Sequence, residues 1–322
     1  MEINNTKVGN NPSISIDYAG QGEMIIFLHG IGGNKKNWTE NLIFFSKKFL
    51  SVAWDTRGYG ESDDYEGDLN FEDVLYDLVK IFKHFNKDKA HIVGLSMGGQ
   101  IATLFYEKYP SYVKSLILCD THFGLSNLSP QEIEKFINLR KEPLINGKEP
   151  KDIAPIVAST LIGDANNISA YEQLVNSMEL LHKESYLKTI ETSMRTEHRH
   201  IFKTIDVPTF IMVGELDTLT PPSMSNEIMK EINSILYAGI LSGGFAFVLQ
   251  IYAQKNITPA PAAIIFSLEG VFATIAAWYI LNQILDINNL LGCLFILCGV
   301  LLSQLLPPVS YTHLTLPTNR EV

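Results

Sequence analysis

Cysteine and positive charge are both scarce in this sequence. Its three cysteines, Cys119, Cys293 and Cys298, have no spacing typical of a disulfide or a zinc site. Only 25 lysines and arginines oppose 35 acidic residues, a net charge of −10 that argues against a nucleic-acid partner. Residues 1–17 contain no apolar stretch of the kind that a secretory signal has. We therefore expect no metal, no cofactor and no nucleic acid, and a cytoplasmic location for residues 1–233.

Charged residues are nearly absent from 234–306, where the only ones are Lys255, Glu269 and Asp286. Helices buried in a protein core would need a larger protein around them, so we favour membrane spans, for which about 20 apolar residues suffice. The change in composition predicts a first domain at 1–233 and three transmembrane helices within 235–306, in contact with membrane lipid. The predicted spans are 235–253, 261–281 and 290–306.

Short apolar runs alternate with longer amphipathic stretches before the boundary. Continuous apolar runs are typical of strands covered on both faces. Alternating strands and helices predict an α/β fold with a mostly parallel sheet. Residues 124–200 show helical periodicity, which predicts a helical cap inserted over the carboxyl edge of the sheet, where ligands bind. The predicted strands are 13–18, 24–29, 50–54, 91–95, 115–120 and 209–213, and helices are predicted at 71–86 and 97–109.

The strongest motif is Gly94-Leu95-Ser96-Met97-Gly98, between a predicted strand and a predicted helix. Such a turn exposes the serine oxygen at the sheet edge, and glycines relieve crowding around the strained backbone. The following helix directs its N-terminus at the site, which favours negative charge. We interpret Ser96 as a nucleophile; the alternative is a tight turn with a structural role only.

A second motif, His29-Gly30-Ile31-Gly32-Gly33, follows the strand MIIFL. The backbone N–H groups of Ile31 and Met97 are candidate donors to an oxyanion. We expect His29 to hydrogen-bond within this loop and not to act as a base. The alternative is an ordinary turn between a strand and a helix.

Two acidic turns follow later strands. The first, residues 55–63, is rich in glycine, and we expect an internal Asp55–Arg57 pair with a structural role. The second ends the strand that begins at residue 209, and a carboxylate there can orient a histidine. Asp217 is the candidate, whereas Glu215 is expected to be solvated.

These four segments, in this order, resemble the α/β-hydrolase family over residues 1–233. The resemblance implies a Ser–Asp–His triad in that chain order, with Ser96 as nucleophile, Asp217 as acid, and Ile31 and Met97 as oxyanion donors. The segments LCDT and GELDTLTPP look most like those of enol-lactonases and small esterases. A small-molecule carboxylic ester or lactone is therefore the expected substrate.

The histidine that this resemblance implies is not found after the acid. No histidine lies between His200 and His313, and His198 and His200 precede Asp217, in the wrong order. His122 is a weaker candidate base. We expect the domain to lack its last strand and helix, and its activity to be lost or strongly impaired.

The apolar region resembles a different family. Residues 267–283 and 290–304 are similar to the last helices of drug/metabolite (EamA) transporters, with Gly270 where that family usually has proline. The alternative function is therefore a transporter fragment fused to a hydrolase-like domain. Residues 309–322 look like translated sequencing adapter, which would make the tail at 307–322 an artefact; the alternative is a disordered threonine-rich tail. Together these features predict a chimeric open reading frame.

Overall fold

The computed structural model describes residues 2–124, 129–164, 166–232, 292 and 294. The chain divides into two units, Met1–Ile240 and Leu241–Val322, and the fold below is that of the first. The predicted boundary, the three predicted spans and the tail fall outside the described residues, apart from Gly292 and Leu294, and stay predictions. Of the helices that are described, none is long and apolar enough to cross a bilayer.

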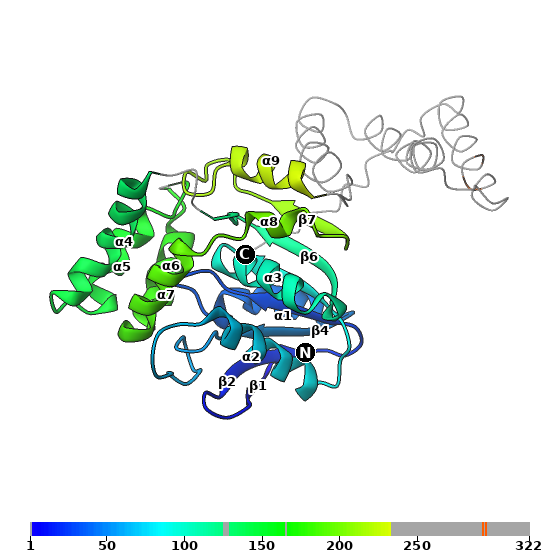
Figure 1. The fold of residues 1–322 in the computed structure, drawn as a ribbon. Coiled ribbons are helices and arrows are strands. Elements are labelled where there is room, and N and C mark those ends of the chain that lie inside the picture. The colour runs from blue at the N-terminus through cyan, green and yellow to red at the C-terminus, as the bar shows by residue number, and fades with distance from the viewer. Residues whose placement is uncertain (1, 125–128, 165, 233–291, 293, 295–322) are drawn as a thin grey trace, which may run out of the picture. The chain divides into compact units, whose positions relative to one another are not determined.

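The described residues form a seven-stranded sheet in the order β1-β2-β4-β3-β5-β6-β7 (Figure 1). β1 pairs antiparallel with β2, and β2 pairs antiparallel with β4. Every other neighbouring pair is parallel, so the predicted mostly parallel sheet is confirmed. The strands are β1 (Asn4–Val8), β2 (Ile14–Ala19), β3 (Met24–Leu28), β4 (Leu50–Trp54), β5 (Ala90–Leu95), β6 (Val113–Cys119) and β7 (Thr209–Met212).

Helices alternate with the parallel strands, and several lie between β6 and β7. Local sequence sets where they begin: the Asn70 side chain accepts the Glu72 N–H at 2.9 Å and so caps α2. The helices are η1 (Lys35–Trp38), α1 (Thr39–Phe45), α2 (Phe71–His84), α3 (Met97–Lys108), η2 (Pro110–Tyr112), α4 (Pro130–Ile145), α5 (Pro150–Ser159), α6 (Ile168–Glu179), α7 (Lys183–Arg195), α8 (Arg199–Phe202) and α9 (Pro222–Glu231).

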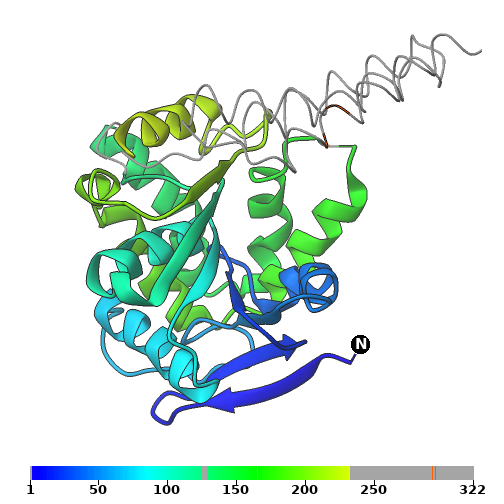
Figure 2. The ribbon, with the colours of Figure 1, turned by 90° about the vertical axis from the view of Figure 1, so that its right-hand side faces the viewer.

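The sheet is covered on both faces, and β3 shows how. Its alternate residues Ile25 and Phe27 pack in a cluster with Leu42 of α1. Met24 and Ile26 belong to the larger cluster that includes buried residues of α2 and α3. The whole strand is therefore apolar, because neither face meets water. Figure 2 shows the sheet between these helices.

Helix α6 and the start of α7 contact the loops that follow the carboxyl ends of β3 and β4, and α4 and α5 pack against these two helices. The Asn34 amide donates to Ser177 Oγ of α6 at 3.1 Å, and His182, at the start of α7, lies 2.9 Å from Asp64 Oδ1. In Figure 1 these helices gather on one side of the sheet. They cover the edge where ligands bind in open α/β folds. Their role as a cap over a substrate stays a prediction.

The expected pair between Asp55 and Arg57 is wrong. Arg57 Nε donates to Asp77 Oδ2 of α2 at 2.7 Å, and its Nη1 lies 3.3 Å from Asp73 Oδ2. Asp55 faces Lys35 instead. Packing of α2 against this loop supplies a closer acid for Arg57 than its neighbour in the sequence.

Candidate active site

Ser96 occupies the turn between β5 and α3 in a strained conformation. Its φ of 51° and ψ of −113° lie in a region that side chains rarely adopt, at an order-of-magnitude cost of ~1–3 kcal/mol. The turn is held because the Ser96 N–H donates to Cys119 O at 2.9 Å and Thr121 Oγ1 donates to Ser96 O at 2.9 Å. Ser96 itself is partly exposed. Backbone strain of this kind, maintained by neighbours, is typical of functional residues.

Three glycines of the two motifs lie in or beside this turn, where a Cβ would have little or no room. A Cβ on Gly94 would sit 2.3 Å from Gly98 O, and one on Gly98 would sit 2.2 Å from Leu28 O. A Cβ on Gly30 would sit 3.3 Å from Ser96 Cβ. The loop of residues 29–34, here called the β3–η1 loop, therefore passes directly beside Ser96.

Two backbone N–H groups near Ser96 make no hydrogen bond in the described part of the chain. Met97 is the first residue of α3, so its N–H has no acceptor within the helix. Ile31 follows Gly30 in the β3–η1 loop, whose turn is closed by the Gly33 N–H donating to Gly30 O at 3.0 Å. In the described part of the chain, no hydrogen bond uses the N–H of Ile31 or Met97. The role of these two N–H groups as oxyanion donors stays a prediction.

His29 is buried at the start of the β3–η1 loop. Its Nδ1 bonds to Gly30 O at 2.9 Å, and its Nε2 accepts the Thr56 N–H at 3.0 Å. Burial lowers the pKa of His29, against the opposing effects of Gly30 O and Asp55. The ring is therefore neutral, with its proton on Nδ1, and both nitrogens are used inside the fold.

Asp217 lies in the turn after β7, next to a second carboxyl group that the sequence analysis missed. Asp217 Oδ1 accepts the N–H groups of Leu219 and Thr220 at 2.8 and 2.9 Å, which fixes its orientation. Asp120, at φ 43°, follows β6 and accepts the Gly214 N–H at 2.7 Å. Burial, with the charge of Asp217, raises the pKa of Asp120, although the Gly214 N–H opposes the shift. The sequence could have pointed to Asp120 as a site residue, because it lies at the end of a predicted strand.

The candidate base His122 makes no hydrogen bond with Ser96 in the described part of the chain. Its Nδ1 accepts the Gly124 N–H at 3.1 Å, and its buried Nε2 has no partner. Burial, with a smaller effect of His198, lowers the pKa of His122 to about 3. His198 is also buried and bonds to His122 O at 2.8 Å. Within the described ranges, no histidine hydrogen-bonds the Ser96 hydroxyl, and no cluster of three or more His, Cys, Asp or Glu could hold a metal.

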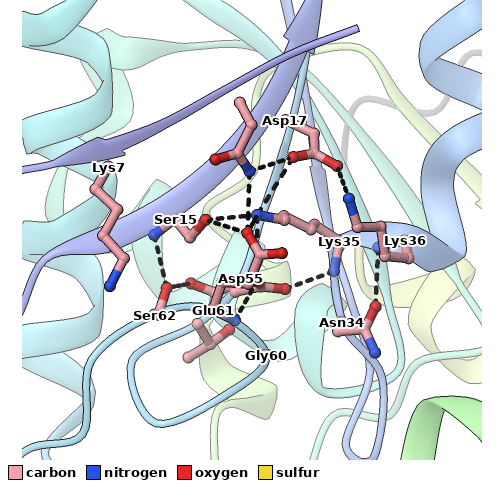
Figure 3. Close-up of polar contacts among 12 residues, drawn as sticks. Lys7, Ser15, Asp17, Asn34, Lys35, Lys36, Asp55, Gly60, Glu61 and Ser62 are labelled. Atoms are coloured by element: carbon pink, nitrogen blue, oxygen red, sulfur yellow. Dashed lines mark hydrogen bonds and ion pairs between the residues drawn. The ribbon is translucent and has the colours of Figure 1, made fainter. Parts of the chain in front are cut away.

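A buried lysine lies at the far end of the β3–η1 loop (Figure 3). Lys35 Nζ is 2.6 Å from Glu61 Oε2, 3.2 Å from Asp17 Oδ1 and 3.6 Å from Asp55 Oδ2. The side chains of Lys35 and Asp55 are each 1% exposed. We call Lys35, Asp17, Asp55 and Glu61 the Lys35 cluster.

The lowered pKa values of carboxyl groups in the Lys35 cluster predict that the fold loses stability in acid. A hydrogen bond and charge from Lys35 lower the pKa of Glu61. Burial would raise the pKa of Asp17, but Lys36, Asn5 and Lys35 together lower it. A carboxyl group whose pKa is lowered on folding stabilises the fold above its unfolded pKa, and this contribution is lost as the pH falls through the folded value. We expect the urea midpoint to fall as the pH is lowered from 5 through 4, the region of the unfolded values, towards 3.

Glu61→Gln is the control variant, because it removes one of these titrations. Its urea midpoint should depend less on pH than that of the wild-type chain over the same range. Equal midpoints for the wild-type chain at pH 7 and pH 3 would contradict the expectation.

Comparison with known proteins identifies one family. The family model described as alpha/beta hydrolase fold matches residues 23–250. Lipase 3 of Moraxella sp. (strain TA144) is 29% identical over 220 residues, 66% of this chain and 67% of its own length. 3-Oxoadipate enol-lactonase 2 of Acinetobacter baylyi is 21% identical over 216 residues, with shares of 64% and 78%. The enol-lactonase structure from Burkholderia xenovorans LB400 has a TM-score of 0.63 at 19% identity, covering 78% of this chain and 98% of that one, a likeness in fold. The chain belongs to the alpha/beta hydrolase fold family.

Proposed function

We propose that this chain is a serine hydrolase that acts on carboxylic esters or lactones of small molecules, with Ser96 as its nucleophile. The observation that carries the proposal is the strained Ser96 turn, beside which the N–H groups of Ile31 and Met97 have no acceptor among the described residues. The relatives named above include a lipase and an enol-lactonase, which supports an acyl–oxygen bond as the target.

The geometry supports a two-step acyl transfer. Ser96 Oγ gives its proton to a base or to water and adds to the substrate carbonyl, and the resulting oxyanion accepts hydrogen bonds from the N–H groups of Ile31 and Met97. Collapse of this intermediate breaks the acyl–oxygen bond, and the leaving alkoxide takes up the proton that Ser96 released and becomes the alcohol. Water then attacks the acyl-serine and releases the acid. Asp217 is proposed as the acid that would orient a histidine base, but among the described residues no histidine hydrogen-bonds to Asp217 or to the Ser96 hydroxyl.

The transport alternative has less support. It depends on residues 235–306, of which only Gly292 and Leu294 are described, and the described helices include no candidate membrane span. The family model extends from 23 to 250 and therefore ends within the first predicted span. Lipid contact, transport and the chimeric origin accordingly stay predictions.

A fluorophosphonate probe tests the proposed nucleophile. We expect the full chain, incubated for hours, to carry a phosphonyl adduct on Ser96, because the probe requires both an exposed serine oxygen and an oxyanion site. Peptide mass spectrometry locates the adduct, and Ser96→Ala is the control. A folded chain, judged by circular dichroism, that carries no adduct on Ser96 would remove the assignment.

A further inference from the structure

We propose that Lys35 is a positioning residue for the oxyanion site and acts on the β3–η1 loop through Asp55. This inference rests on the proposed function, because it gives the N–H of Ile31 a catalytic task. It concerns a side chain that does not belong to the Ser96 turn and that the motifs of the sequence did not single out.

Consecutive residues after β4 hold both ends of the β3–η1 loop. Asp55 Oδ1 accepts the Lys35 N–H at 2.7 Å, directly beyond the end of the loop. The Thr56 N–H donates to Nε2 of His29, at the beginning of the loop, at 3.0 Å. Ile31 lies between these two attachments. A shift of Asp55 therefore moves the segment that carries the oxyanion donor.

The Asp55 carboxylate is itself fixed by close contacts. Its Oδ2 accepts the Glu61 N–H at 2.9 Å and lies 3.6 Å from Lys35 Nζ. A Cβ on Gly60 would lie 2.4 Å from Asp55 Oδ2, so a side chain there would displace the carboxylate. The backbone of Lys35 thus donates to the same carboxylate that its ammonium group neutralises.

Lys35 also balances two further carboxylates. Its Nζ contacts Asp17 and Glu61 as well as Asp55, so one buried ammonium group is the ion-pair partner of three carboxylates. A buried charge that loses its partner is strongly unfavourable. Without the Lys35 charge, Asp17 and Asp55, which both face Lys35 Nζ, lose this shared partner in the interior, and their repulsion is relieved by movement of Asp55. This movement alters the bond from Asp55 to the Lys35 N–H.

The neighbouring Lys36 provides a matched comparison. It also binds Asp17, at 2.8 Å, but its side chain is 56% exposed. No ion pair joins Lys36 to Asp55 among the described residues. Loss of Lys36 therefore removes a positive charge near Asp17 and leaves the contact between Lys35 and Asp55 in place.

A structural role alone and a positioning role predict different kinetics with the fluorophosphonate probe. A variant that is merely less stable contains fewer folded molecules, so its observed labelling rate falls only in proportion to the folded fraction, and the rate constant per folded molecule is unchanged. A misplaced oxyanion donor slows phosphonylation in every folded molecule. Misplacing or losing one donor costs ~10- to 1000-fold in rate.

The experiment compares the full-length wild-type chain with Lys35→Met, Lys35→Gln and Lys36→Met. We expect Lys35→Met to lower the rate constant of Ser96 labelling per folded molecule ~10- to 100-fold, where circular dichroism gives the folded fraction. Lys35→Gln, which can still hydrogen-bond, should show a smaller decrease, and it serves as the test if the methionine variant does not fold. Lys36→Met should stay within ~3-fold of wild type, as expected for an exposed ion pair.

Equal rate constants per folded molecule for wild type and both Lys35 variants, with only the folded fraction reduced, would overturn the positioning role. A decrease for Lys36→Met as large as for Lys35→Met would also overturn it, because the effect would then be one of general charge. Failure of the folded wild-type chain to label Ser96 would instead remove the proposed function.

Discussion

Ester hydrolysis by the full chain is expected to be slow and to rise when imidazole is added as an external base. No histidine lies between Asp217 and His313, and none of the described histidines bonds to the Ser96 hydroxyl. A serine without an adjacent base is a weak nucleophile. General base catalysis contributes about 10²–10⁴-fold, so a small base that enters the site should recover part of it. We expect at least a ~10-fold rise in the initial rate with p-nitrophenyl acetate.

The Ser96→Ala chain is the essential control, because imidazole in solution also cleaves this ester. With imidazole present, the hydrolysis rate of that variant should equal the rate of the same imidazole solution without protein. Substantial turnover in the absence of imidazole, abolished by Ser96→Ala, would contradict the expectation. Loss of that turnover in His122→Ala would then identify His122 as the base, despite the low pKa that burial gives it.

Much of the sheet was predictable because its strands are buried on both faces. The six predicted strands coincide with β2 to β7 to within two residues at each end. The Ser96 turn was predictable for a different reason. Its glycines, its serine and the flanking strand and helix are all local in sequence, so the motif specifies the geometry directly.

Features that depend on contacts distant in sequence were not predictable. β1, Asn4–Val8, has the sequence NNTKV and no apolar run; it is a strand because it pairs with β2 at the sheet edge. Lys35 would be expected in solvent by residue type, yet Asp17, Asp55 and Glu61 converge on it from other segments. The incorrect Asp55–Arg57 pair has the same cause, since neighbours in sequence were preferred over neighbours in space.

The second large effect is expected from Gly98→Ala, which should destabilise the whole fold. Alanine is favoured over glycine in a helix by about 1 kcal/mol, and Gly98 is the second residue of α3. The new Cβ would lie 2.2 Å from Leu28 O and 2.9 Å from His29 O, both backbone atoms of the neighbouring strand and loop. Backbone cannot rotate away as a side chain can, so α3 must separate from β3. Overpacking of this kind costs about 1–3 kcal/mol, occasionally more, and we expect the net loss at the upper end of that range.

Gly214→Ala is the matched control for stability, since a Cβ there would lie 3.8 Å from its nearest neighbour, Asp120 Oδ1. Its free energy of unfolding in urea should stay within about 0.5 kcal/mol of wild type. Gly98→Ala should also slow labelling of Ser96 in the molecules that remain folded, because moving α3 displaces the Met97 N–H together with the turn. A urea midpoint for Gly98→Ala equal to that of wild type would contradict this expectation. The helix preference of alanine would then offset the overpacking of the new Cβ against β3, and the close contact between α3 and β3 would not be needed for the Ser96 turn.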